Sequence, residues 1–352
     1  MSIMSRQACF IKGVVGRLQD TTFPRAGLFG NTRVLLSTTS LKQDKSSYHN
    51  RDLRRVTTRA SPIKHCIPKG TWDTHMHVVD PQRFPVSPNA VYKPSKHTIE
   101  EAMAFESSLG IGKIILVQPS IYGTDNSCLL EALRHVGPSR GRAVVVIDPA
   151  TIDSQTLADW HSMGVRGVRV NLKSVDTVLD ERELTEMLLQ HAQVIRPLGW
   201  VIQVYVSLEM VPILEKIVPQ LGVKLCIDHF GSPDLTTGDN PLQGAASFDP
   251  YSLAGFSSLI SLLQAGKTYV KISAPYRLSK DGQYRDLEVM AREFLRVAPD
   301  RVLYATDWPH TRFAGMDIEP FTETCLHLCE NVPGLADRVF RRNAEEMMGE
   351  DA

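Results

Sequence analysis

The sequence predicts an α/β protein, a single-domain (β/α)8 TIM barrel. From Gly70 onward, eight short runs rich in Val and Ile alternate with segments of helical spacing. The runs are 71–78, 113–119, 142–148, 165–172, 200–206, 224–229, 268–274 and 302–306. Most of them are nearly continuous apolar runs, as parallel strands buried on both faces are. Eight strand–helix units in about 280 residues match a (β/α)8 barrel. A doubly wound open sheet is the alternative, but no Gly-rich phosphate-binding turn follows the first run.

Two of the intervening segments begin with a helix-capping pattern, and two carry clear helical periodicity. Thr98 with Glu101, and Asp180 with Glu183, have the spacing of a capping box. Apolar side chains then recur at 3.6-residue spacing in two segments, Leu184, Met187, Leu188, His191 and Ile195, and Leu287, Met290, Ala291, Phe294 and Leu295. These segments are therefore expected to be helices that pack on the sheet.

The overall composition is that of an ordinary globular protein. The chain has 352 residues, of which 43% are hydrophobic and 22% are charged. No run approaches the ~18 consecutive apolar residues of a membrane-spanning helix. The 39 basic residues equal the 39 acidic ones, so net charge gives no reason to expect nucleic acid or an anionic membrane as a partner. A small-molecule substrate is the expected partner.

The positive charge is concentrated in the N-terminal segment. Residues 1–69 hold 13 Lys and Arg but only three acidic residues, which leaves 26 basic and 36 acidic residues for the rest. An Arg-rich, Ser-rich, acid-poor leader is typical of a mitochondrial transit peptide. We therefore expect a disordered leader over 1–66, followed by the barrel over 67–352, in a mitochondrial protein. A disordered tail on a cytoplasmic protein is the alternative.

The six cysteines do not form a recognised pattern. None is part of a CxxC pair, and six in a chain of this length are too few for a disulfide scaffold. Cys325 and Cys329 lie four apart on an expected helix, but no further ligand at zinc spacing completes a metal site. Reduced thiols in an intracellular compartment are expected.

Polar side chains stand where the first and last predicted strands end. His75 and His77 are two residues apart, so both imidazoles point to one face of the strand. Such a pair serves a divalent metal or polarises an oxygen, although two structural histidines would give the same pattern. Asp307 follows the last strand, before Trp308 and Pro309. A carboxylate there suits a general base or a metal ligand, or a simple helix cap.

Other strand ends carry further candidates. Arg166 and Arg169 are three apart and therefore face opposite ways, and a buried arginine needs an anionic partner. Arg169 lies nearer the carboxyl end and is expected to meet a ligand. Ser120 is expected either to bind substrate or to cap its turn. The loop 231–249 is long enough to suggest a lid over the site.

Six segments together resemble one enzyme family. They are DTHMHVVDP (73–81), VQPSIYGTDN (117–126), GVRGVRVNL (164–172), DHFG (228–231), KISAPYRLS (271–279) and YATDWPH (304–310). They resemble the amidohydrolase superfamily, its amidohydrolase-related branch, and within it are most similar to the 2-pyrone-4,6-dicarboxylate lactonases. The resemblance covers essentially all of 70–350.

The resemblance implies a hydrolase that opens a lactone with water. Asp307 would be the general base, and His75, His77 and His229 would polarise the scissile carbonyl. The substrate would be held by six side chains, Tyr92, Ser120, Arg169, Tyr205, Arg277 and His310. Where that family carries a second arginine, six residues after Arg169, this chain has Val175. A carboxylated pyrone-like lactone and a sugar-type lactone therefore both remain open.

The same resemblance implies that no metal and no other cofactor is needed. Metal-dependent relatives carry a histidine at the end of the fifth strand, where this chain has Tyr205, and a neutral phenol is a poor zinc ligand. A divalent metal at His75, His77 and Asp307 is the alternative. Two other functions compete with lactone hydrolysis: a metal-dependent decarboxylation, and a non-catalytic barrel that only binds.

Overall fold

The computed structural model describes residues 62–175, 179–235 and 248–349. All eight predicted strands are present, with ends that differ by a few residues: β1 (Trp72–Met76), β2 (Lys113–Val117), β3 (Gly141–Val145), β4 (Val165–Asn171), β5 (Val201–Tyr205), β6 (Leu225–Ile227), β7 (Thr268–Ile272) and β8 (Val302–Tyr304). Each strand pairs in parallel with the next, in the order β1 to β8. The barrel prediction is confirmed and the open-sheet alternative is wrong.

The ring of strands closes where β1 meets β8. A parallel bridge joins Met76 to Trp308. The backbone N–H of Thr306 donates to Asp73 Oδ1 at 3.0 Å, and its hydroxyl donates to Asp73 Oδ2. Thr74 Oγ1 donates to the Tyr304 carbonyl at 2.8 Å. Side chains of β1 therefore fasten the two ends of the sheet together.

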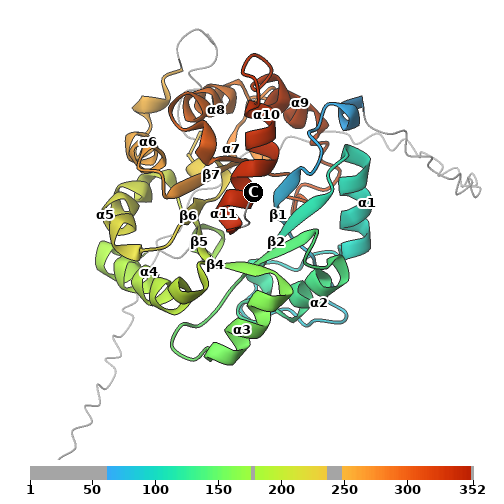
Figure 1. Ribbon diagram of the computed structural model, residues 1–352, viewed down its shortest axis with the longest axis vertical. Helices are drawn as coiled ribbons and strands as arrows, with labels where there is room; N and C mark the ends of the chain where they lie inside the picture. The colour runs from blue at the N-terminus through green and yellow to red at the C-terminus, as the bar shows by residue number, and fades with distance from the viewer. Residues whose placement is uncertain (1–61, 176–178, 236–247, 350–352) are drawn as a thin grey trace, which may run out of the picture. The chain divides into compact units, whose positions relative to one another are not determined.

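Helices surround the strands, as Figure 1 shows. The helices that follow the strands in turn are α1 (Ile99–Leu109), α2 (Ser127–Val136), α3 (Ser154–Met163), α4 (Glu181–Ile195), α5 (Val211–Leu221), α6 (Phe256–Gln264), α7 (Pro275–Leu278) with α8 (Arg285–Val297), and α9 (Glu319–His327) with α10 (Leu335–Asp337). Both predicted capping boxes are present, at the starts of α1 and α4. The predicted helical stripes of α4 and α8 are buried or half-buried.

The last helix, α11 (Asn343–Met348), closes one end of the barrel. Met347 and Met348 belong to a buried apolar cluster with barrel residues such as Trp72 of β1 and Tyr269 of β7. In Figure 1 this helix lies across the ring of strands. Because it covers the end where the strands begin, the open rim is the one where they finish.

Several expectations fall outside the described residues. Most of the predicted leader, 1–61, and the central part of the predicted lid, 236–247, belong to segments that the structure does not describe. Among the described residues, no helix has the length and apolar character needed to cross a membrane. The cysteines described, Cys66, Cys128, Cys226, Cys325 and Cys329, are all free thiols.

Candidate active site

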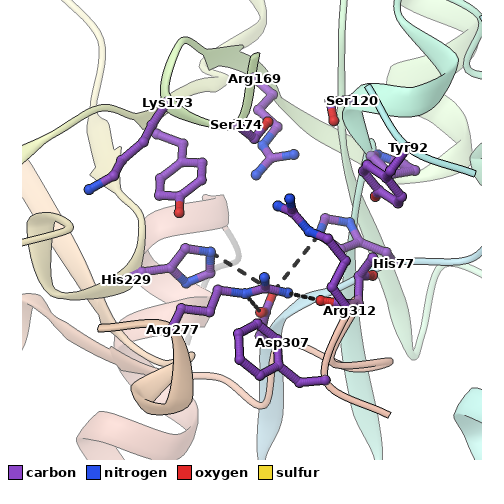
Figure 2. Close-up of a pocket in the computed structure, with 14 residues that line it drawn as sticks. His77, Tyr92, Ser120, Arg169, Lys173, Ser174, His229, Arg277, Asp307 and Arg312 are labelled. Atoms are coloured by element: carbon purple, nitrogen blue, oxygen red, sulfur yellow. Dashed lines mark hydrogen bonds and ion pairs between the residues drawn. The ribbon is translucent and has the colours of Figure 1, made fainter. Parts of the chain in front are cut away.

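A cavity of about 460 Å³ opens at the carboxyl ends of the strands. It is lined by His77, Tyr92, Pro119, Ser120, Arg169, Lys173, Ser174, Tyr205, His229, Arg277, Asp307, Thr311, Arg312 and Phe313 (Figure 2). Eight of the ten predicted site residues are in this lining. In a (β/α)8 barrel this rim is where catalytic residues gather.

Three imidazoles converge on one oxygen of Asp307. The Nε2 atoms of His75, His77 and His229 lie 3.8, 3.9 and 3.9 Å from Asp307 Oδ1. Figure 2 shows His77 and His229 reaching this carboxylate from opposite sides. The histidines come from β1 and the turn after β6, and the aspartate comes from the turn after β8. Segments far apart in sequence thus build one polar centre.

The other oxygen of Asp307 is held by two donors. Tyr276 donates its hydroxyl to Oδ2 at 2.7 Å, and Arg277 donates its Nε–H at 2.8 Å. Burial disfavours the charged carboxylate, but the adjacent Arg277 cation and the imidazoles outweigh burial and hold the Asp307 pKa well below its usual range. Asp307 is therefore ionised at neutral pH, with Oδ1 turned toward the cavity.

The hydrogen bond to the far nitrogen of His77 fixes its role, and the one to His229 is compatible with the opposite role. His77 Nδ1 lies 2.7 Å from the Val117 carbonyl, which only accepts, so Nδ1 carries the proton and the neutral Nε2 is an acceptor. His229 Nδ1 lies 2.8 Å from Ser273 Oγ, a hydroxyl that either donates to it or accepts from it. When Ser273 donates, His229 Nε2 carries the proton and is the donor. The two rings therefore suit different tasks.

Burial keeps both rings neutral. Desolvation lowers the pKa of His77 to about 4, and the nearby Arg169 cation adds to the effect. Desolvation also lowers the pKa of His229 to about 4, although Asp307 opposes that shift. At neutral pH these imidazoles act as hydrogen-bonding groups and not as cations.

A buried charge network supports His75 from behind the cavity wall. Asp228, directly after β6, lies 3.2 Å from His75 Nδ1, accepts from Gln203 Nε2 at 2.8 Å, and lies 3.4 Å from an Arg169 nitrogen. Lys271 of β7 is fully buried; its Nζ donates to Gln203 Oε1 and to the Thr74 carbonyl, both at 2.8 Å. Desolvation lowers the pKa of His75 well below its usual value. His75 Nδ1 faces both an acceptor, Asp228, and a donor, Lys271 Nζ at 3.3 Å, so these contacts are compatible with either tautomer of the ring.

The arginine pair of β4 behaves as its spacing predicts. Arg166 donates to the His161 and Val165 carbonyls, away from the cavity. Arg169 points inward, where it meets the carboxylate of Asp228 and donates to the Gln118 carbonyl at 2.9 Å. The inward arginine therefore has the expected anionic partner and also borders the cavity.

Backbone strain is concentrated at the same rim. Asp307 (φ 63°), His229 (φ 50°) and Arg312 (φ 71°) adopt left-handed conformations although none is glycine. Each such residue costs roughly 1–3 kcal/mol, which the surrounding structure must offset. For Asp307 the backbone is held on both sides, because its N–H donates to the His75 carbonyl at 3.0 Å and its carbonyl accepts from His310 at 2.9 Å. With this backbone conformation, the Asp307 carboxylate lies beside the imidazoles.

Two predicted site residues lie behind the lining. His75 is fully buried and reaches the centre only through Nε2. His310 is buried edge-on to Tyr276 and Phe105, with ring centroids 5.5 and 5.8 Å away. Burial lowers the pKa of His310 to about 4. The structure thus places His310 next to Asp307 but behind the cavity surface.

Sequence reasoning assigned no role to several residues that the structure brings to the site. Tyr276 binds Asp307, Ser273 binds His229, and Lys271 supports the network, while Lys173 and Arg312 line the cavity. The period-2 rule gave a signal for two of them, because Lys271 and Ser273 are polar residues on one face of an otherwise apolar strand. Arg312 lies in the loop after β8, where no periodicity applies.

The same centre has ligands of the types that bind a divalent metal. One set is His75, His77 and Asp307, and a second is His75, Asp228 and His229; in each set the ligand atoms lie within 4.8 Å of one another. In the second set, Asp228 already binds Gln203, Arg169 and Lys271. The first set presents imidazole Nε2 atoms and a carboxylate oxygen, so its chemistry fits a metal. Arg277 disfavours a metal at this set, because its positive charge is already 2.8 Å from the Asp307 carboxylate.

The lowered histidine pKa values predict loss of stability in mild acid. In the unfolded chain these imidazoles bind protons near pH 6.5, whereas His77 and His229 resist protonation until about pH 4 when folded. The unfolded state therefore binds more protons between these values, and the free energy of unfolding should fall as pH drops from about 6.5 to about 4. Urea unfolding across this range tests the prediction; a free energy that does not change with pH would contradict it.

Known proteins resemble this chain in sequence and in fold. Residues 72–349 match the amidohydrolase family. The chain is 31% identical over 264 residues to a 4-sulfomuconolactone hydrolase of Rhizobium radiobacter, covering 72% of this chain and 81% of that protein. It is 32% identical over 254 residues to a 2-pyrone-4,6-dicarboxylate hydrolase of Comamonas testosteroni, covering 69% and 78%. A crystal structure of a putative 2-pyrone-4,6-dicarboxylic acid hydrolase from Pseudomonas putida superposes with a TM-score of 0.66 at 26% identity, covering 80% of this chain and 98% of that one.

Proposed function

Because the chain belongs to the amidohydrolase family, we propose that it hydrolyses an anionic lactone, with Asp307 as the base that activates water. The observation that carries the proposal is the convergence of three imidazole Nε2 atoms on Asp307 Oδ1 in a cavity lined by four cationic side chains. The relatives named as lactone hydrolases support the substrate class. Since the cationic lining attracts anions, a carboxylated lactone fits better than a neutral sugar lactone.

Two acceptors in the cavity support water as the attacking group. Asp307 Oδ1 and the neutral Nε2 of His77 are both acceptors, 3.9 Å apart, and a water that donates one hydrogen to each would keep a lone pair for the carbonyl carbon. On attack the water oxygen bonds to that carbon and its proton passes to Asp307. The carbonyl oxygen, now negative, accepts from His229 Nε2–H. Collapse breaks the ring C–O bond, and the leaving oxygen takes the proton from Asp307.

Binding of a substrate carboxylate to Arg277 would make Asp307 a stronger base. In the free protein this cation keeps the pKa of Asp307 low, and a carboxylate with a low pKa is a weak base. Arg277 donates its Nε–H to Asp307 and an N–H of one terminal nitrogen to the Thr311 carbonyl. A substrate carboxylate bound by the same guanidinium would offset its charge. The pKa of Asp307 would then rise toward the range in which it accepts a proton from water.

We propose further that the reaction needs no metal. The proposal is supported by Arg277, Arg169 and Lys271, which already surround the two buried carboxylates with positive charge. A divalent ion at His75, His77 and Asp307 would instead supply a Lewis acid and lower the pKa of its bound water. Exhaustive chelation is expected to leave turnover unchanged. Loss of activity that zinc or manganese restores would contradict the metal-free proposal and favour the metal-dependent alternative, decarboxylation included.

A substrate screen tests the proposed activity itself. Purified, metal-stripped protein should be assayed for acid release from three classes of lactone: pyrone carboxylates, muconolactones and neutral aldonolactones. We expect opening of the first two and little or none of the third. A protein that opens no lactone of any class, yet binds carboxylates, would be the non-catalytic barrel.

We also propose that the N-terminal segment directs the chain to mitochondria. The support is its composition, 13 basic against three acidic residues in 1–69. A fusion of residues 1–66 to a fluorescent protein tests this. Diffuse cytoplasmic fluorescence would contradict mitochondrial targeting and support the cytoplasmic alternative.

A further inference from the structure

One acidic side chain lies in the buried stripe of helix α1. The buried positions of this helix are Ile99, Ala102, Glu106 and Leu109. Glu106 is fully buried, and neither oxygen of its carboxyl group is reached by a hydrogen-bond donor of the described residues. The one charged group of the described chain that acts on it is another carboxyl, that of Asp73. A buried carboxylate with no donor and no cation would be prohibitively costly.

Asp73 of β1 differs from Glu106 in its hydrogen bonds. The two carboxyl groups lie within hydrogen-bonding reach of each other, and Asp73 is also fully buried. The backbone N–H groups of His75 and Thr306 each donate to Asp73 Oδ1 at 3.0 Å, and the Thr306 hydroxyl donates to Oδ2. Two adjacent buried carboxyl groups do not both ionise, and donors favour the charged form. Asp73 is therefore the anion, and the proton resides on Glu106.

The surroundings of Glu106 agree with a neutral acid. Burial raises the pKa of Glu106 well above its usual value, and the negative charge of Asp73 adds to the rise. Tyr304 is buried nearby, but its hydroxyl lies 2.6 Å from that of Thr322, and it does not reach Glu106. Asp73 is then the acceptor for the Glu106 O–H, since a carboxylate has about four lone-pair sites and three donors already use the others.

The Asp73 anion connects this carboxyl pair to both halves of the proposed catalytic centre. It accepts directly from the backbone of His75. It also holds Thr306, whose hydroxyl oxygen accepts from the Trp308 N–H at 3.0 Å. Asp307 lies between these two residues, and its own N–H donates to the His75 carbonyl at 3.0 Å. The backbones that carry the imidazole and the carboxylate are thus attached to one buried anion.

We propose that Glu106 is a positioning residue of the active site: as a neutral carboxylic acid it donates to Asp73, and Asp73 holds the backbones of His75 and Asp307 in place. Glu106 acts through Asp73 and is not part of the cavity lining. Its effect on turnover rests on the proposed lactone hydrolysis, whereas its proton is measurable without turnover. The side chain required at this position is a neutral donor of the length of glutamate, which glutamine also provides.

Infrared spectroscopy detects the proton directly, because the C=O stretch of a carboxylic acid is separate from the bands of a carboxylate. The difference spectrum of the full-length wild type and Glu106→Gln at neutral pH should contain one carboxylic acid band, present in the wild type and lost in the variant. Glu323→Gln is the control, since it removes an exposed carboxyl group on α9 and should remove no such band. A difference spectrum without the band would overturn the proposal.

Turnover of a lactone tests the positioning role. Glu106→Gln keeps a neutral donor to Asp73 and should retain most of the wild-type kcat. Glu106→Leu removes the donor at similar volume and should lower kcat by about 10- to 100-fold, the order of loss when reacting groups are displaced by about 1 Å. KM should change far less than kcat, because Arg169 and Arg277 make no hydrogen bond to either member of the pair.

Urea unfolding of each variant separates positioning from stability. A Glu106→Leu protein that folds and keeps the wild-type kcat would overturn the positioning role, and so would equal losses of kcat in the glutamine and leucine variants. The infrared test uses the wild type and Glu106→Gln alone, so it decides the protonation even where Glu106→Leu does not fold. If the wild type opens no lactone but the acid band is present, the hydrolase proposal fails and the proton on Glu106 stands.

Discussion

Replacing Asp307 by asparagine is expected to lower kcat for lactone opening by about 10²- to 10⁴-fold, the usual contribution of a general base. The amide keeps the shape of the side chain but cannot take a proton from water at neutral pH. It also removes the negative charge that pairs with Arg277, which is 2.8 Å from Asp307 Oδ2 in the native protein. Binding of a carboxylated ligand should therefore be retained or become tighter. Steady-state kinetics and calorimetric titration of benzoate give the two readouts.

The matched control is Asp159→Asn, on the outer face of α3. That carboxylate is exposed and accepts a hydrogen bond from Gln155, so the variant should keep wild-type kinetics. If Asp307→Asn retains most of the wild-type kcat, the aspartate is not the base. If it loses ligand binding together with turnover, its role is structural, and the assignment of base chemistry to this carboxylate fails.

Replacing Lys271 by methionine is expected to lower the free energy of unfolding by about 3–5 kcal/mol, because it removes one partner from a buried charge network. Lys271 is fully buried and lies 3.5 Å from Asp228, which is also fully buried. The variant leaves Gln203 Oε1 and the Thr74 carbonyl without their donor. It also leaves Asp228 with less compensating charge. Urea unfolding measured by circular dichroism gives the free-energy change.

An exposed lysine provides the comparison. Lys216 on α5 makes an ion pair of 2.7 Å with Glu181, and both side chains are more than half exposed. Lys216→Met should therefore cost no more than about 1 kcal/mol. A double variant, Lys271→Met with Asp228→Asn, should cost less than the sum of the two single changes, since it removes both charges. Equal costs for the buried and the exposed lysine would show that the network contributes little.

The barrel was predictable from the sequence because its strands are buried on both faces. Such strands appear as continuous apolar runs, and all eight were located in this way. Helix α4 shows the same agreement, because Asp180 and Glu183 form their capping box and Leu184, Leu188 and Ile195 are buried. The period-2 rule also placed His75 and His77 on one side of β1. These are local features, and local patterns are enough to predict them.

The rest depends on register and on hydrogen bonds between strands. Sequence spacing alone does not show that Lys271 of β7 meets Gln203 of β5, because these residues are 68 positions apart. The acceptor role of His77 Nε2 follows from a contact with Val117, 40 positions away. The inward direction of Arg312 depends on a left-handed backbone in an irregular loop. Each of these needs the closed barrel before it can be recognised.

The contact between β1 and β8 that closes the ring of strands also brings the proposed catalytic residues together. Asp73 joins the first strand to Thr306. His75 lies two residues after Asp73, and Asp307 directly follows Thr306. A chain that has assembled only part of the ring holds the imidazoles and the carboxylate on separate edges. The catalysis proposed for these residues therefore requires a closed ring. During refolding, we expect turnover to return only with closure of the ring.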